Sequence, residues 1–132
     1  MFRLVAGVIV GFASWLAIGA TSFLLLRTSW AAYALAEPHK AYTFGMLLSR
    51  LSVGVVCSVA AGCLSTVVAK GNGKAAWWLG GLLLLISAPV HLVDVWADYP
   101  AWYHFAYLLP LMPITGFGGR LGSDRQRASR RG

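Results

Sequence analysis

Four long stretches of this chain are nearly free of charged side chains, and this pattern restricts its fold more than any other feature. Charged residues make up 11% of the 132 residues, hydrophobic ones 58%, and the mean hydropathy is +0.68. A charge at the centre of a bilayer costs about 2.5–3.5 kcal/mol, and about 20 apolar helical residues cross the hydrocarbon core. The stretches therefore predict transmembrane helices near residues 4–26, 44–69, 75–97 and 101–118.

The order of these stretches predicts an all-α fold, an antiparallel up-down four-helix bundle embedded in a membrane. The helices fill residues 1–119 as a single domain and leave no room for a soluble one. Residues 120–132 contain glycine, serine and arginine but almost nothing apolar, which predicts a disordered basic tail. A cleaved signal peptide is the alternative for the first stretch, but its apolar core would have about 7–15 residues, whereas Leu4–Leu26 has 23.

The connection between the first two stretches, residues 27–43, is polar and aromatic. Trp30, Tyr33 and Ala34 share one helical face, and Pro38 would end such a helix. A short helix on the membrane surface and an irregular loop both fit this pattern.

The positive charges predict the orientation, because cytoplasmic segments of membrane proteins carry the excess of Lys and Arg. With the N-terminus inside, eight of the 11 Lys and Arg residues lie on the cytoplasmic side, leaving only Arg27, Lys40 and Arg50 outside. We therefore expect a multi-pass protein of the bacterial inner membrane with both termini in the cytoplasm.

Small residues recur at four-residue spacing in the first two stretches. These helix-packing positions are Gly7, Gly11, Gly54, Ser58 and Gly62. Such rows allow the backbones of membrane helices to approach closely, so we expect tight helix contacts along them.

Ionisable side chains gather near the outer ends of the helices. His91, Asp94 and Asp98 share a helical face by their i, i+3, i+7 spacing, and His104 lies at a similar depth on the last helix. Arg50 enters from the second helix, so we predict one connected polar cluster of Arg50, His91, Asp94 and His104, with Asp98 beside it.

Four interpretations of this cluster are open. It is a structural network in which Arg50 pairs with Asp94, a proton or ligand site, a divalent metal site, or a haem site between His91 and His104. The tight turn before the last helix leaves little room for a haem. We expect the structural network, with neither a metal nor a cofactor.

No catalytic or nucleotide-binding motif occurs in the sequence, so we assign no catalytic residue. This absence favours an accessory or structural membrane protein that acts through helix–helix association with itself or with other membrane subunits. The alternative is a small transporter, or an ion- or ligand-binding protein that uses the outer cluster.

The expected partners are the lipid bilayer and anionic lipid at the basic tail. Nucleic acid is not expected, because no aromatic residues are interleaved with the basic charges.

The stretch Tyr99-Pro-Ala-Trp-Tyr-His104, with Leu108, Leu109, Pro113 and Gly118-Gly-Arg-Leu121, resembles the C-terminal part of small uncharacterised bacterial four-helix membrane proteins. The Glu37-Pro38 loop and Met46, Arg50 and Leu51 are also similar to that group. The resemblance implies a four-helix membrane fold and transfers no site.

Overall fold

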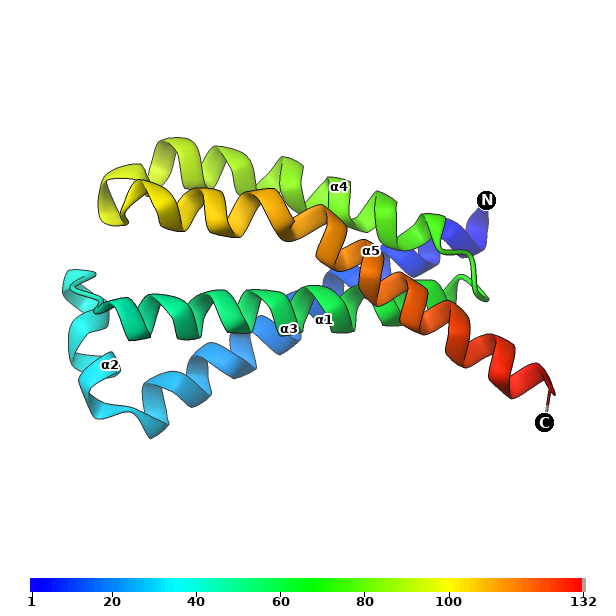
Figure 1. The fold of residues 1–132 in the computed structure, drawn as a ribbon, viewed down its shortest axis with the longest axis horizontal. Coiled ribbons are helices and arrows are strands. Elements are labelled where there is room, and N and C mark those ends of the chain that lie inside the picture. The colour runs from blue at the N-terminus through cyan, green and yellow to red at the C-terminus, as the bar shows by residue number, and fades with distance from the viewer. Residues whose placement is uncertain (132) are drawn as a thin grey trace.

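The part of the chain that the structure describes, residues 1–131 of a computed structural model, consists of helices and turns without strands. The four long helices are α1 (Phe2–Ser29), α3 (Phe44–Val68), α4 (Lys74–Pro89) and α5 (Ala101–Arg131). The short elements are α2 (Ala31–Ala36) and the turns η1 (Glu37–His39), η2 (Val90–Asp94) and η3 (Trp96–Asp98). Successive long helices run in alternate directions, and both termini lie at the same end of the molecule (Figure 1).

Three helical segments are long and apolar enough to cross a membrane, namely Phe2–Ser29, Phe44–Val68 and Lys74–Asp94. They coincide with the first three predicted helices, so three of the four predicted spans are helices that could cross a membrane, and α5 is not among them. The fourth predicted helix, residues 101–118, forms the first part of the longer α5.

The interior of the protein is built largely from small side chains, while many large apolar ones face outward. In α1 only Gly7 and Gly11 are buried, whereas Leu24 and Leu25 are exposed. One limited core contains larger apolar side chains, with Leu79, Leu83 and Leu111 packed together with Ala61. This distribution is the opposite of that in a soluble domain and is typical of helices surrounded by lipid.

The helices α3 and α5 cross at glycine contacts. A Cβ atom added to Gly62 would collide with the carbonyl oxygen of Thr115, and one added to Gly118 would collide with that of Val59. The backbones therefore touch without intervening side chains. The predicted small residues contribute here and elsewhere, since Gly7 and Gly11 contact α3 in the same way and Gly54 lies against the ring of Tyr107.

The predicted disordered tail is instead helical as far as Arg131, and Gly132 lies outside the described residues. Gly122 packs on the backbone of Cys63, and the amide of Gln126 donates to the carbonyl oxygen of Val67 over 2.9 Å. The Ser123 hydroxyl donates to the carbonyl oxygen of Gly71 over 3.2 Å. These bonds connect the tail to the end of α3 and to the following turn, so the tail is held against the bundle despite its polar composition.

The third predicted helix, residues 75–97, is interrupted where α4 gives way to the π-helical turn η2. Pro89 lies at that junction and has no N–H for the regular helical bond, which favours a change of hydrogen-bonding pattern. The amide of Val95 donates to the carbonyl oxygen of Val90, five residues earlier. The π turn sets the direction of His91, which lies within it.

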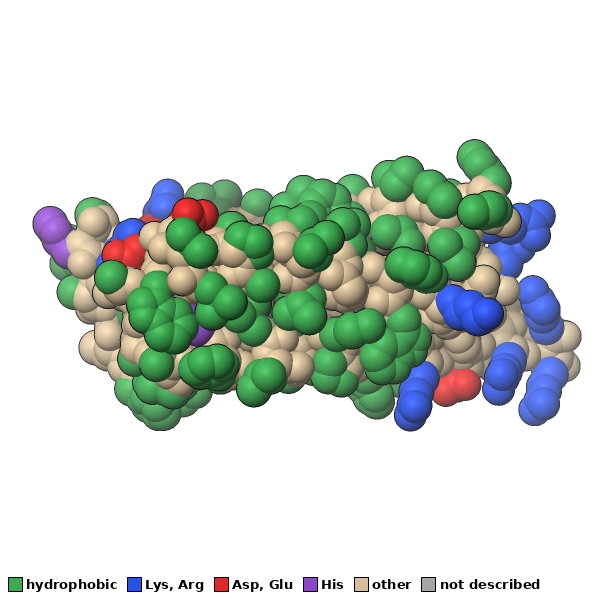
Figure 2. Space-filling model, turned by 90° about the horizontal axis from the view of Figure 1, so that it is seen from above, with side chains coloured by type: hydrophobic (Ala, Val, Ile, Leu, Met, Phe, Trp, Pro, Cys, Tyr) green, Lys and Arg blue, Asp and Glu red, His purple; other side chains and the backbone are tan. Residues whose placement is uncertain are grey.

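Charge divides the two ends of the molecule. Figure 2 shows many Lys and Arg side chains at one end, which is also the end of both termini, and hydrophobic side chains over the middle. The opposite end carries acidic and basic side chains together. The two ends therefore differ strongly in net charge.

We expect Gly118→Ala to lower the free energy of unfolding by about 1–3 kcal/mol, because the added methyl group must push the backbone of α3 away. Equilibrium unfolding in detergent micelles measures this loss. The matched control is Gly81→Ala on α4, where an added Cβ meets nothing within 4 Å. Equal stability of the two variants would contradict the glycine contact.

Candidate functional site

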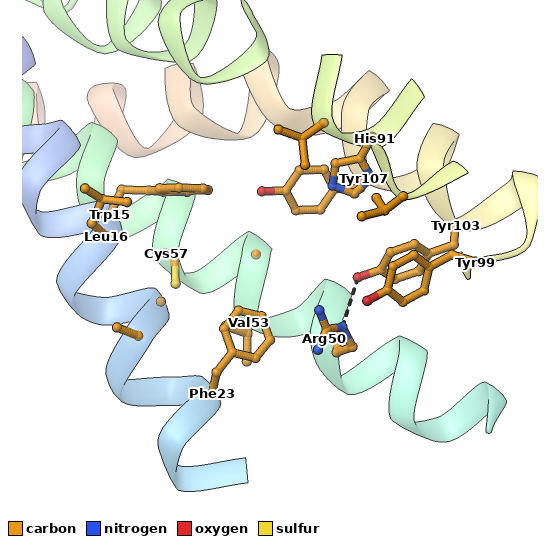
Figure 3. Close-up of a pocket in the computed structure, with 15 residues that line it drawn as sticks. Trp15, Leu16, Phe23, Arg50, Val53, Cys57, His91, Tyr99, Tyr103 and Tyr107 are labelled. Carbon is orange, nitrogen blue, oxygen red and sulfur yellow. Dashed lines mark hydrogen bonds between the residues drawn. The ribbon is translucent and has the colours of Figure 1, made fainter. Parts of the chain in front are cut away.

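A cavity of about 410 Å³ lies between α1, α3, η2 and α5, near the end of the bundle that carries α2. Its volume falls within the range of small-molecule sites, roughly 300–1,000 Å³. Figure 3 shows Arg50 of α3 on one side of this space and Tyr99 and Tyr103 on the other. The opposite end of the cavity is lined by Trp15 and Cys57.

Arg50 is the single cationic side chain that lines the cavity, and its guanidinium is bound by tyrosine hydroxyls. Its Nη1 donates to Tyr33 over 2.5 Å and to Tyr42 over 3.3 Å, while its Nε donates to Tyr103 over 3.4 Å. A guanidinium has five N–H donors, so these bonds use three of them. The two on Nη2 have no protein partner among residues 1–131.

Aromatic rings surround the same guanidinium. Its Cζ lies 4.8 Å from the ring centroid of Phe23, 4.9 Å from that of Tyr42 and 5.6 Å from that of Tyr99. Each cation–π contact of this kind contributes about 0.5–2 kcal/mol. Rings and hydroxyls stabilise the positive charge without neutralising it.

Arg50 has no carboxylate partner in the described structure, because the acids near it are bound elsewhere or face outward. Glu37 pairs with Arg27 over 2.5 Å, and Asp98 pairs with Lys40. Asp94 is exposed on η2. An Arg in this setting presents an uncompensated positive charge to the cavity, and a bound anion would lower the electrostatic cost.

The two histidines form a pair next to this charge. Nδ1 of His91 lies 3.1 Å from Nδ1 of His104, and Nε2 of His104 lies 3.2 Å from the carbonyl oxygen of Trp96. A carbonyl oxygen only accepts, so Nε2 of His104 carries the proton and its Nδ1, in the neutral ring, is an acceptor. Nδ1 of His91 must then donate to it. This leaves Nε2 of His91, a cavity-lining ring stacked on Tyr107 at 4.4 Å, as a free acceptor.

The predicted polar cluster is thus only partly assembled. Arg50 and His91 share the cavity, and the fully buried His104 supports His91 from behind. The predicted Arg50–Asp94 pair is absent from the described residues, since the tyrosines occupy the guanidinium instead. Asp98 bridges to Lys40 in the outer connection.

Sequence reasoning overlooked the tyrosines around Arg50. All five tyrosines of the chain lie in the segments at this end of the molecule, and three of them, Tyr99, Tyr103 and Tyr107, recur at four-residue spacing. This recurrence, at the depth expected for Arg50, is the sequence signal of an aromatic site; in the structure Tyr103 and Tyr107 share a face of α5, and Tyr99 lies just before the helix.

The connection between α1 and α3 covers the cavity at its polar end. Tyr33 of α2 is fully buried and Tyr42 stacks on Tyr99 with ring centroids 5.8 Å apart. Hydrogen bonding to Arg27 lowers the pKa of Glu37, so this anchoring pair stays charged near neutral pH. Burial raises the pKa of Tyr42, which keeps its hydroxyl protonated and able to donate.

Within residues 1–131, no three His, Cys, Asp or Glu side chains converge closely enough to hold a metal ion. The polar groups of the cavity are the N–H and O–H donors around Arg50 and the free acceptor Nε2 of His91. Donors gathered around a cation favour binding of an oxyanion.

No known protein family, curated protein or solved structure matches this chain.

We expect nitrogen NMR of protein labelled with ¹⁵N-histidine to find, at neutral pH, a proton on Nε2 of His104 and on Nδ1 of His91. These proton positions follow from the Trp96 carbonyl oxygen, which can only accept a hydrogen bond from Nε2 of His104. The exposed His39 serves as the internal control and should show the mixed tautomers of a solvated ring. Nδ1 protonated in both rings would contradict the assignment.

Proposed function

We propose that this chain is a non-enzymatic ligand-binding protein of the bacterial inner membrane, which holds an anionic molecule beside Arg50. The observation that carries the proposal is the guanidinium in a cavity without a carboxylate, with the two Nη2 donors unoccupied in the described structure. Hydrogen bonds to a charged group contribute about 1.5–3 kcal/mol each, so such donors favour an oxyanion.

The membrane placement in this proposal has four spans, α1, α3, Lys74–Asp94 and the first part of α5, in an antiparallel up-down bundle. Both termini and the helical tail face the cytoplasm, because eight Lys and Arg residues lie at that end against three at the other. Its arginines are then positioned to contact anionic lipid headgroups. The resemblance to small bacterial four-helix membrane proteins agrees with this placement.

Binding fits the cavity better than transport across the membrane. Beyond Trp15 the interior is filled by the core of Ala61, Leu79, Leu83 and Leu111, against which Phe12 and Trp15 pack. The cavity therefore ends inside the bundle.

An accessory role through helix–helix association is the weaker candidate. Its support was the rows of small residues, and Gly7, Gly11 and Gly62 make their close contacts within this chain. Those rows are then no longer available as surfaces for a partner.

Arg50→Gln should weaken binding of butyrate, a small carboxylate probe, by roughly tenfold or more, because it removes the charge and the Nη2 donors. Saturation-transfer NMR on the full chain in phosphatidylcholine nanodiscs measures this affinity. Arg27→Gln is the matched control, since Arg27 is exposed at the same end and already paired with Glu37. Arg50→Lys should retain part of the binding. Equal affinity of the wild type and Arg50→Gln would overturn the proposal.

A cysteine placed at position 72 (Asn72→Cys, with Cys57 and Cys63 changed to serine) should react with a membrane-impermeant maleimide in inverted vesicles and not in intact spheroplasts. His39→Cys should behave in the opposite way, because residue 39 lies at the other end of the bundle. Labelling of position 72 in spheroplasts would reverse the orientation.

A further inference from the structure

We propose that the ligand of the Arg50 cavity is a single-chain amphipath with an anionic oxyacid head, and that it enters sideways from the bilayer between α1 and η2. This inference rests on the proposed anion binding and specifies its ligand class. Its first support is the polarity of the cavity, which changes along its length.

Arg50 and its tyrosine partners lie at one end of the cavity, His91 and Tyr107 line its middle, and the remaining lining is mostly apolar. Arg50, Tyr99 and Tyr103 form the polar end, where Phe23 lies over the guanidinium. Trp15 comes eight residues before Phe23 on α1, and its indole N–H donates to Ser58, eight residues beyond Arg50 on α3. Eight residues of helix rise about 12 Å, so a mostly apolar channel of that length leads away from the charge.

The water-facing end of this channel is closed. Tyr33 and Tyr42 contact both the guanidinium and each other, with ring centroids 5.5 Å apart. The pair of Lys40 and Asp98 joins the same connection to the turn before α5. A ligand that came from water would have to displace this cover.

The side of the channel is open at the depth of the bilayer. Leu16 and Ala20 in the middle of α1 and Val90 on η2 line the cavity and are exposed on its rim. Toward this end α1 diverges from α4 (Figure 1), so the rim residues border lipid rather than protein. Gly19 keeps the passage wide, since an added Cβ would meet only the Cys57 sulfur at 3.9 Å.

The head group must be an anion that accepts several hydrogen bonds. Nη2 of Arg50 supplies two donors, and the hydroxyl of Tyr103 accepts from Nε and keeps its own proton to donate. A carboxylate or a phosphate monoester satisfies this set equally well. A cavity of about 410 Å³ lies near the lower limit for ligand sites and suits one chain rather than two.

The test uses the full chain in phosphatidylcholine nanodiscs, with empty nanodiscs subtracted for partitioning, and 12-bromododecanoate as the probe. Its terminal bromine should quench Trp15, so the wild type should lose more fluorescence than Trp15→Phe, in which the other five tryptophans report the background. Dodecanoate and dodecyl phosphate should both compete with the probe. The stronger competitor of the two shows whether the site prefers a carboxylate or a phosphate head group. Uncharged dodecanol should not compete.

Gly19→Leu separates this inference from the proposed function. Its side chain would extend into the channel and should weaken dodecanoate binding at least tenfold, while butyrate beside Arg50 stays within about twofold of the wild type. Gly81→Leu, at an open position outside the cavity, should change neither. Unchanged dodecanoate binding in Gly19→Leu, or competition by dodecanol, would overturn the inference and leave the anion site standing. Failure of both butyrate and dodecanoate to bind the wild type would refute the proposed function itself.

Discussion

The contact between the backbones of α3 and α5 is the constraint on which the rest of the structure depends. Around Gly62 and Gly118 the two helices touch without side chains between them, and Gly7 and Gly11 let α1 approach α3 closely as well. Toward the other end the same helices carry rings, among them Phe23, Tyr103 and Tyr107. Helices held by glycine at one end and separated by aromatic rings at the other must diverge. This divergence of the helices creates the cavity. The aromatic side chains that line the cavity are also the ones that keep the helices apart.

Charge follows the same division. The glycine end carries the eight Lys and Arg residues that predict a cytoplasmic location, with Asp124 as the one acid among them. At the wide end the acids and bases pair with each other, as Arg27 does with Glu37 and Lys40 with Asp98. Arg50 and Asp94 are left over from that pairing: Asp94 is exposed on η2, and the charge of Arg50 is stabilised by ring faces and hydroxyls. The site is built around the one Lys or Arg of this end that has no acidic partner in the described structure.

Hydropathy alone locates the helices well, because a bilayer tolerates few alternatives to long apolar helices. Hydropathy fails where contacts between distant side chains, rather than local composition, determine the structure. The tail is polar yet helical, since Gly122 and Gln126 bind the end of α3, and such contacts between distant segments leave no local pattern. Likewise, spacing on one helix places His91 and Asp94 together, but the π turn after Pro89 and the choice of partner for Arg50 depend on the whole bundle. The sequence predicts the depth of Arg50 and the histidines, but the hydroxyls that bind the guanidinium come from three separate segments that only the complete fold brings together.

The buried glycine contacts of α1 all lie in the first half of this helix. Gly7 and Gly11 clamp its first half, and the arm from Gly11 to Ser29 extends for roughly 27 Å with no further buried residue. The free end of the arm continues into α2, whose Tyr33 is tied to Arg50 by a bond of 2.5 Å. The guanidinium of Arg50 therefore binds the segment that follows α1 and also lines the cavity. A change at Arg50 would therefore act at once on the segment that follows α1 and on the cavity.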